Sequence, residues 1–350
     1  MMTDIPTDHN HSKVTIREVA RRAGVSISSV SRALSDHPHV SPTLRARVES
    51  AAQALGYQPD FLAQRLRRGD TASVGFLVGA ISNPIMADIY TNSSNVLAAE
   101  GYAMILACSQ NQPESDRRYL HFFAQRQVSG LILSTAADGP DSTGDLLHNM
   151  GIPTVMLDRA PHSSPFISAV QSDHGTGIEK AVRHLWEGGH RRIALIGGAE
   201  HFFPAANRLA AFHQTLELLG SNADPTLIHS VGMSREVGYR AVQQLLALPQ
   251  PPTALIAGGN LILAGVLQAL HERNIAIGRE LALVGCDDTE LTRLHTPPIT
   301  VIARNLALLG ETAGRLLLAA MQQRGGETVT LPTHLLIRDS SFHPVIHTHL

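Results

Sequence analysis

Arginine side chains are concentrated in one short part of this 350-residue chain. Between Lys13 and Gly69 the sequence holds ten basic and four acidic residues, a net charge of +6, so the rest carries −8 of the total of −2. Guanidinium groups form bidentate hydrogen bonds with phosphate and with the edge of guanine. A basic segment on an acidic body is typical of a nucleic-acid-binding module joined to a non-binding domain, and a solvated basic surface is the alternative.

The stretch Val14–Leu34 supplies the elements that would position these groups. Thr15 and Glu18 have the spacing of a capping box, Gly24 can end the first helix, and Ser26 can cap a second. The second helix is expected to bury Val30 and Leu34. Its exposed positions would be Ile27, Ser28, Ser29 and Arg32. Two helices joined by a Gly-containing turn form the helix-turn-helix pattern, whose second helix enters the major groove of DNA. A helical hairpin inside another kind of domain is the alternative.

A third helix and a short basic helix follow this pattern. Ser41 is expected to cap the third helix, with Pro42 at its first position and Gly56 at its end. Its inner face would consist of Leu44, Val48, Ala51 and Leu55. Asp60 can cap a further helix that Gly69 stops. That helix is both apolar and basic, so it is either a plain linker or a wedge for the minor groove.

From Ser73 onward, apolar strand-like runs alternate with helical segments. Continuous apolar strands separated by helices indicate parallel sheets that are covered on both faces. About ten such units exceed one compact sheet, and the pattern restarts near Arg191. The sequence therefore predicts an α/β core of two similar lobes. Ligands of open α/β sheets bind beyond the carboxyl ends of the strands, which places a site in the cleft between the lobes.

Several classes of protein are not favoured by the composition. The two cysteines, Cys108 and Cys286, are far apart, and the 19 histidines show no metal-ligand spacing. The first twelve residues lack the apolar region of a signal peptide, and no run is long enough to span a membrane. Catalytic and dinucleotide motifs are also lacking. We therefore expect a cytoplasmic protein that is not an enzyme, with no catalytic residues, cofactor, metal site or membrane partner.

Motifs spread over the whole chain resemble the LacI/GalR family of bacterial transcription regulators. They are TIREVARRAGVSISSVSRAL, HVSPTLRARVESAAQALGYQPD, SNPIM, VSGLILS, IPTVMLDR, HLWEGGHRRIALIGG, RLAAF, VGCDD and PPITVI. The resemblance implies a three-helix helix-turn-helix head and a hinge helix, followed by a two-lobed core similar to periplasmic sugar-binding proteins. The expected division is a disordered tail at 1–12, the head at 13–59, the hinge helix at 60–70, the core at 71–343 and a tail at 344–350. Within the core, lobe 1 would be 71–170 with 299–332, and lobe 2 would be 171–295 with 334–343.

The resemblance also implies that the head reads a palindromic operator as a homodimer. Base edges would be read by Ile27, Ser28 and Arg32, while Arg32 could instead contact phosphate. Phosphate contacts are expected from Thr15, Ser26, Ser29, Ser31, Ser41 and Arg45. Leu66 matches the family's minor-groove leucine, and Ala63 matches the hinge position packed beside it. No leucine heptads follow the core, so a dimer is expected rather than a coiled-coil tetramer.

The family's effector pocket can be carried over in the same way. It falls on Asn83, Ile85, Met86, Asp158, Arg159, Arg208, Met233, Asp287, Arg304 and Leu306. Three arginines at one cleft favour an anion, so the hypothesis is a sugar acid of the gluconate or ketogluconate type, with a neutral sugar as the alternative. Arg304 carries this argument, because the family often has the other two arginines without an anionic ligand. The chain departs from the family at Gly258 and Gly259, where many members have Asn-Asp.

The sequence thus predicts a repressor of carbohydrate or sugar-acid catabolism genes that a small effector controls through the spacing of the hinge helices. Both induction and co-repression are compatible with the sequence. A sugar receptor without a regulatory role is the alternative, although it would need a signal peptide and would have no basic head.

Overall fold

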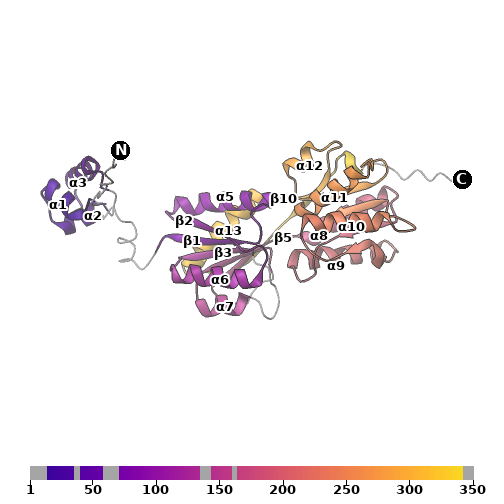
Figure 1. Cartoon of the computed structure of the whole chain (residues 1–350). Coiled ribbons are helices and arrows are strands. Elements are labelled where there is room, and N and C mark those ends of the chain that lie inside the picture. Colours follow the sequence, from indigo (N-terminus) through magenta and orange to yellow (C-terminus); the bar gives the residue numbers. More distant parts are fainter. Residues whose placement is uncertain (1–13, 35–39, 58–70, 135–142, 160–163, 342–350) are drawn as a thin grey trace, which may run out of the picture. The chain divides into compact units, whose positions relative to one another are not determined.

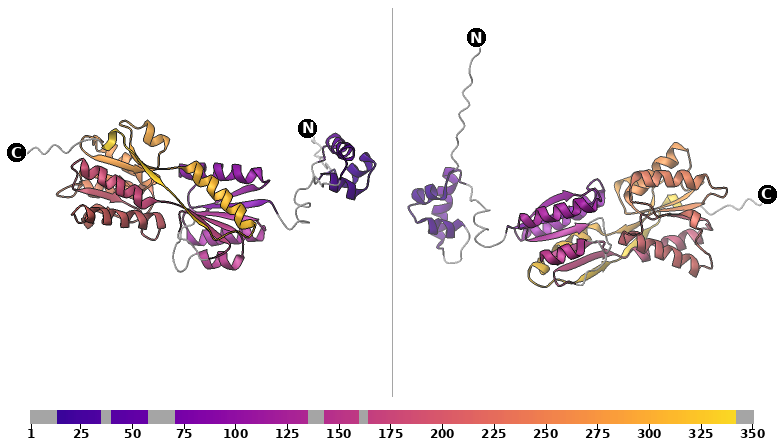
Figure 2. Two further views of the ribbon diagram at one scale, coloured as in Figure 1. Left: turned by 180° about the vertical axis from the view of Figure 1, so that it is seen from behind. Right: turned by 60° about the horizontal axis from the view of Figure 1, so that its bottom comes forward.

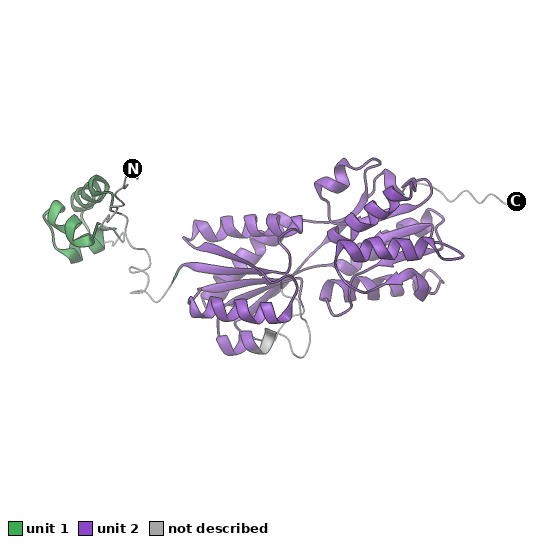
Figure 3. Ribbon diagram, viewed as in Figure 1, with its two compact units in different colours: residues 1–71 green, residues 72–350 purple. Residues whose placement is uncertain are grey.

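The computed structural model describes residues 14–34, 40–57, 71–134, 143–159 and 164–341. The chain forms two compact units, residues 1–71 and residues 72–350 (Figure 3). The hinge, the two tails and the predicted minor-groove residues Ala63 and Leu66 lie outside the described residues. None of the described helices is long and apolar enough to cross a membrane.

Three helices make up the described part of the first unit: α1 (Ile16–Ala23), α2 (Ile27–Leu34) and α3 (Pro42–Leu55). The capping box is present, since the Glu18 carboxylate accepts hydrogen bonds from the Thr15 backbone N–H (2.7 Å) and hydroxyl (3.0 Å). Ser26 caps α2 through a bond from the Ser29 N–H at 3.1 Å. Gly24 has a φ of 65°, which lets the chain leave α1 in a sharp turn. The helix boundaries predicted from these residues are therefore confirmed.

The three helices share a small apolar core. Val19, Val30 and Val48, one from each helix, are fully buried, and alanines fill the space between them. The partly buried residues packed around this centre include Ile16, Leu34, Leu44 and Leu55. Short aliphatic side chains suit a core of only three helices, because they let the backbones approach closely.

Lobe 1 is built on a six-stranded parallel sheet (Figure 1). In spatial order its strands are β2 (Ala103–Cys108), β1 (Ser73–Val78), β3 (Gly130–Ser134), β4 (Thr154–Leu157), β5 (Ile167–Ser172) and β11 (Thr328–Leu331). One face is covered by α5 (Pro84–Ala99) and α13 (Leu306–Met321), and the other by α6 (Pro113–Gln125) and α7 (Thr143–Met150). Successive residues of β1, such as Phe76 and Leu77, enter the two opposite cores.

Lobe 2 repeats the same plan. Its strands are, in spatial order, β7 (Ile228–His229), β6 (Ile193–Ile196), β8 (Ala254–Ala257), β9 (Ala282–Cys286), β10 (Thr300–Arg304) and β12 (Thr333–Leu336), with only β12 antiparallel to its neighbour. The helices α8 (His174–Glu187) and α9 (Phe203–Leu218) cover one face, and α10 (Arg235–Leu246) and α11 (Asn260–Glu272) cover the other. The short helices are η1 (Pro225–Leu227), α12 (Glu290–Leu294) and η2 (Asp339–Ser341).

The chain crosses between the lobes after β5, after β10 and between β11 and β12 (Figure 2). The predicted lobe division differs from the structure at two places. Residues 171–172 were assigned to lobe 2 and belong to β5 of lobe 1, and residues 300–304 were assigned to lobe 1 and form β10 of lobe 2. The strand pairs with β9 through Thr300, Val301 and Ile302, and the crossing therefore falls at Asn305. The helices α7 and α13 were not predicted at all. These corrections matter for the cleft, because Arg304 belongs to lobe 2.

Candidate functional site

Nine of the ten residues predicted to bind an effector line one cavity of about 120 Å³ between the lobes. Lobe 1 contributes Asn83, Ile85 and Met86 at the start of α5, and Asp158 and Arg159 after β4. Lobe 2 contributes Arg208 from α9, Met233 before α10, Asp287 after β9 and Arg304 at the end of β10. The tenth residue, Leu306, packs against the core of lobe 1 instead. The cavity thus lies at the carboxyl ends of the strands, as expected for this sheet topology.

Two aspartates occupy equivalent positions in the two lobes. Asp158 directly follows β4 and Asp287 directly follows β9, and each of these strands is the fourth in its sheet order. Both residues have a left-handed backbone, with φ of 47° and 71°. Such a conformation is uncommon for residues other than glycine, and it turns the chain sharply at the end of the strand. As a result, both carboxylates reach the same guanidinium group.

That group belongs to Arg304. Its Nη1 donates to Asp158 Oδ2 and its Nε donates to Asp287 Oδ1, both at 2.5 Å. The side chains of Arg304, Asp158 and Asp287 are only 6%, 13% and 3% exposed. The two carboxylates raise the pKa of Arg304 despite its burial, so the guanidinium stays charged. The Arg304 charge is therefore balanced within the protein, and Arg304 by itself does not indicate an anionic effector.

His174, at the start of α8, contacts Asp158 and so extends this network. Its Nδ1 accepts a hydrogen bond from Arg208 Nη2 at 3.2 Å, which places the ring proton on Nε2, 3.2 Å from Asp158 Oδ1. Burial and the nearby Arg208 charge lower the pKa of His174, so the ring is neutral. Burial alone would raise the pKa of Asp158, but the contacts with His174 and Arg304 and the bond from the Ser172 N–H (2.7 Å) hold it far below its usual range.

Asn260 is a site residue that sequence analysis missed. It lines the cavity at the start of α11, and its Nδ2 donates to Asp287 Oδ2 at 2.9 Å and to Asn83 Oδ1 at 3.3 Å. Its position just after the apolar strand β8 was the available signal, because polar residues at strand ends face the cleft. The neighbouring Gly259 explains part of the departure from the family pattern: a Cβ there would lie 3.0 Å from Met233 Cε. Met233 thus fills space that a larger side chain would occupy.

The cavity also has one aromatic wall. Phe202 lines it, and the Phe202 ring centroid lies 5.8 Å from Cζ of Arg159. The Arg159 side chain is further fixed by a bond from Nη1 to the backbone oxygen of Asp158 at 2.8 Å. Phe202 could be suspected from the sequence, because AEHFFPAANR supplies aromatic residues just before Arg208. The ring adds an aromatic surface to a pocket that is otherwise lined by aliphatic, neutral polar and charged groups.

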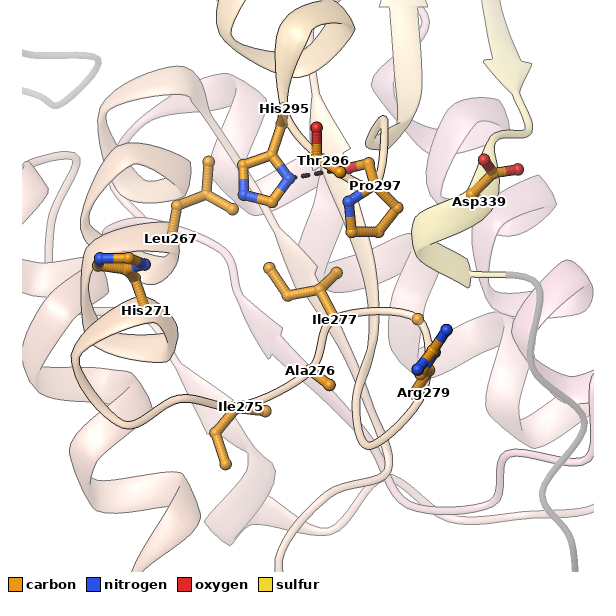
Figure 4. A pocket seen from close by; sticks show the side chains of 11 residues that line it. Leu267, His271, Ile275, Ala276, Ile277, Arg279, His295, Thr296, Pro297 and Asp339 are labelled. Carbon is orange, nitrogen blue, oxygen red and sulfur yellow. Dashed lines mark hydrogen bonds between the residues drawn. The ribbon is translucent and has the colours of Figure 1, made fainter.

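A second, larger hollow of about 720 Å³ lies on lobe 2 (Figure 4). It is bounded by the end of α11, by the loop 275–279 and by the segment 295–297, where His295 Nδ1 lies 2.8 Å from the oxygen of Pro297. None of the predicted site residues lines it. Its side chains Ala276 and Arg279 are exposed, so this is an open surface hollow and not an enclosed site.

In the first unit, the predicted DNA-contacting residues gather around α2 and the N-terminal ends of the helices. Ile27, Ser28 and Arg32 are exposed, with Ile27 at 45%, while Val30 and Ala33 of the same helix are buried. The predicted phosphate contacts lie at the cap of α1 (Thr15), at and after the cap of α2 (Ser26, Ser29, Ser31), and at the cap and first turn of α3 (Ser41, Arg45). An exposed apolar side chain and an exposed arginine on the same helix are the two kinds of group that read base edges.

Comparison with known proteins assigns both units. Residues 15–60 match the family model of bacterial regulatory proteins of the lacI family, and residues 182–341 match a periplasmic binding protein-like domain. The HTH-type transcriptional repressor CytR of Escherichia coli (strain K12) is 31% identical over 330 residues, which cover 93% of this chain and 96% of that protein. The chain belongs to the LacI family. It is a DNA-binding transcriptional regulator and not an enzyme, which sets aside the receptor alternative.

Two further LacI-family relatives are informative. The ribose operon repressor of Escherichia coli (strain K12) is 31% identical over 299 residues, 85% of this chain and 90% of that protein. The lac repressor dimer bound to operator and the anti-inducer ONPF has a TM-score of 0.83 at 27% identity, covering 94% of this chain and 99% of that one. The LacI-family architecture of a helical head followed by two parallel-sheet lobes is therefore shared along nearly the whole chain.

Proposed function

We propose that this regulator is a repressor that binds a palindromic operator as a homodimer and responds to a neutral monosaccharide in the cavity between its lobes. The observation that carries the effector class is the pairing of Arg304 with Asp158 and Asp287. Since this arginine is neutralised internally, the cavity has no surplus cation at that position. Arg304 therefore gives no support for a sugar acid, and Arg208 is a cavity cation left to contact a ligand.

Two unsatisfied polar atoms support a ligand with hydroxyl groups. Arg208 Nη1 is a buried donor and Asn260 Oδ1 a buried acceptor, and neither has a hydrogen-bond partner among the described residues. Both residues line the cavity and are at most 8% exposed. Buried polar groups are normally paired, so an occupant should supply both an acceptor and a donor. Sugar hydroxyl groups do both.

The size of the cavity favours a single ring. An engineered protein cavity of about 150 Å³ binds benzene, and the cavity between the lobes is of similar size at about 120 Å³. Phe202 offers one apolar surface for the face of such a ring. Among solved structures, a LacI-family regulator of Enterococcus faecium with bound ribose is 26% identical, with a TM-score of 0.69 and coverage of 78% of this chain and 99% of that one. Ribose is thus a suitable first probe.

Calorimetric titration of the full chain with D-ribose and with D-gluconate tests the effector class. We expect ribose to bind, and Arg208→Met to weaken it by at least about tenfold, because a hydrogen bond to a charged group contributes roughly 1.5–3 kcal/mol. Arg240→Met is the matched control, since Arg240 is exposed on α10 and does not line the cavity. Binding of gluconate with no binding of ribose or other neutral sugars would overturn this part of the proposal.

Selection of bound sequences from a random DNA pool tests the operator. The dimer of the lac repressor on its operator is the structural precedent. We expect two inverted half-sites, because a two-fold symmetric dimer presents two copies of α2 to the DNA. In this proposal Ile27, Ser28 and Arg32 read base edges, and Ala63 and Leu66 act in the minor groove. A selected site without inverted symmetry would contradict dimeric binding.

A further inference from the structure

Among the described residues, Arg304, His174 and Asn260 of lobe 2 make polar contacts with lobe 1 across the cavity. Arg304 Nη1 of lobe 2 contacts Asp158 Oδ2 of lobe 1 at 2.5 Å, and His174 Nε2 of lobe 2 lies 3.2 Å from Asp158 Oδ1. Asn260 Nδ2 of lobe 2 donates to Asn83 Oδ1 of lobe 1 at 3.3 Å. Of the three, only the Arg304 contact joins two fully charged groups, since His174 is neutral.

The position of Arg304 in the fold strengthens this contact. It is the last residue of β10, and the chain crosses to lobe 1 immediately afterwards, at Asn305. Its Nε is fixed to Asp287 of its own lobe, which leaves Nη1 aimed at Asp158 of the other lobe. The aspartates are the equivalent residues of the two lobes, so the guanidinium connects matching points on the two halves of the cleft. Parting the lobes would have to separate this nearly buried ion pair.

The carboxylates are also saturated by protein groups. Asp158 Oδ1 accepts from the Ser172 N–H and Asp158 Oδ2 from Arg304. Asp287 Oδ1 accepts from Arg304 and Asp287 Oδ2 from Asn260. All four oxygens therefore have partners while the cavity of about 120 Å³ remains beside them. An effector can enter that space without displacing Arg304.

We propose that Arg304 is an internal clamp, which holds the two lobes together before any effector binds and withholds Asp158 and Asp287 from the effector. The proposal rests on the proposed function only in placing the effector in this cavity. Effector specificity then comes from Arg208, Asn260 and Phe202. Lobe closure is a property of the chain itself, and the effector modifies an arrangement that already exists.

Measurement of the distance between the lobes in the effector-free full chain tests the clamp. Spin labels can be attached through Gln125→Cys on α6 of lobe 1 and Gln214→Cys on α9 of lobe 2, both exposed positions. Cys108→Ala removes the partly exposed native thiol, and Cys286 is buried. Double electron–electron resonance then gives the interlobe distance distribution, with labelled protein diluted in unlabelled protein so that one chain per dimer is observed.

We expect a single narrow population for the parent protein. Arg304→Gln and Asp158→Asn should each shift the population to longer distances and broaden it, and the double variant should go no further than either single one, because both remove the same contact. Arg338→Gln is the matched control: Arg338 Nη2 pairs with Asp288 Oδ1 at 2.7 Å within lobe 2. It should leave the distribution unchanged.

Two results would overturn the clamp: a parent-like distribution for Arg304→Gln, or shifts of the two single variants that add in the double variant. A circular dichroism melt of each variant establishes that it is folded, and if Arg304→Gln does not fold, Asp158→Asn decides alone. Because no effector is present in these measurements, they remain decisive even if the neutral-sugar assignment fails.

Discussion

Replacing Arg304 by methionine should destabilise the core strongly, because it removes the positive charge that two aspartates share. Methionine keeps nearly the length of the side chain, so the effect reports mainly on the charge. The partners Asp158 and Asp287 lie 2.5 Å from the guanidinium and are 13% and 3% exposed, so water cannot replace it fully. Breaking a buried ion pair leaves an uncompensated charge and typically lowers the free energy of unfolding by about 3–5 kcal/mol. We expect a loss in that range for Arg304→Met, a large share of the ~5–15 kcal/mol that stabilises a typical domain.

The loss should depend on pH in a defined direction. In the parent protein the pKa of Asp158 is lowered, so its contribution to stability is complete above the ordinary value of 3.8 and is lost only as the pH falls below it. In Arg304→Met burial is no longer offset by Arg304, so the pKa of Asp158 rises and the folded variant takes up a proton more readily. The destabilisation should therefore be largest near pH 7.5 and smaller near pH 5.

Urea unfolding followed by the fluorescence of Trp186, the single tryptophan, measures these changes, since this residue lies on α8 of lobe 2. The control is Arg240→Met, which removes an ion pair of the same length, 2.5 Å, from an exposed site where Arg240 and Glu236 are 72% and 62% exposed. Exposed pairs contribute about 0–1 kcal/mol, so little change is expected. A loss below about 1 kcal/mol for Arg304→Met, or one that does not vary with pH, would refute the reasoning.

Three further predictions concern other parts of the molecule. Arg32→Ala should remove the preference of the chain for its operator over random DNA in a gel-shift assay while calorimetric effector binding is unchanged, and a parallel fall in effector affinity would contradict this division of roles. Gly259→Ala should fold normally but bind ribose more weakly, because its new Cβ lies 3.0 Å from the flexible end of Met233 and pushes it into the cavity. Gly198→Ala should also lower the melting temperature, because Gly198 has a φ of 90° and its new Cβ would lie 2.2 Å from the Met233 sulfur. Equal melting temperatures of the two variants would count against the packing argument. Burial lowers the pKa of His184, so its contribution to stability should be complete above the ordinary pKa of 6.5 and decline as the pH falls below it. In the same urea assay, the stability of His184→Gln should therefore vary less with pH between pH 7.5 and 5.5.

Local patterns in the sequence were sufficient to predict the head. Helix starts and ends depend on neighbouring residues, so Thr15 with Glu18, Ser26, and Ser41 with Gly56 could be read directly from their spacing. The alternation of apolar strands and helices likewise predicted two lobes with parallel sheets. Because parallel strands place their carboxyl ends at one edge, this pattern also predicted where the cavity lies. The individual residues came from the resemblance to the LacI/GalR family, and nine of the ten line the cavity.

What the sequence could not determine was how charged groups pair across the cleft. Arg304 stands 17 residues from Asp287 and 146 from Asp158, and only the packing of two lobes brings the three together. The same holds for Asn260, whose partner Asn83 is 177 residues away. The sequence by itself determined the helices of the head and the alternation of strands and helices in the core, since these follow from capping and periodicity. Its resemblance to a family indicated most of the residues that reach the cleft. The tertiary structure alone decided that Arg304 is balanced by two carboxylates, because pairing depends on distances between segments that no local pattern encodes.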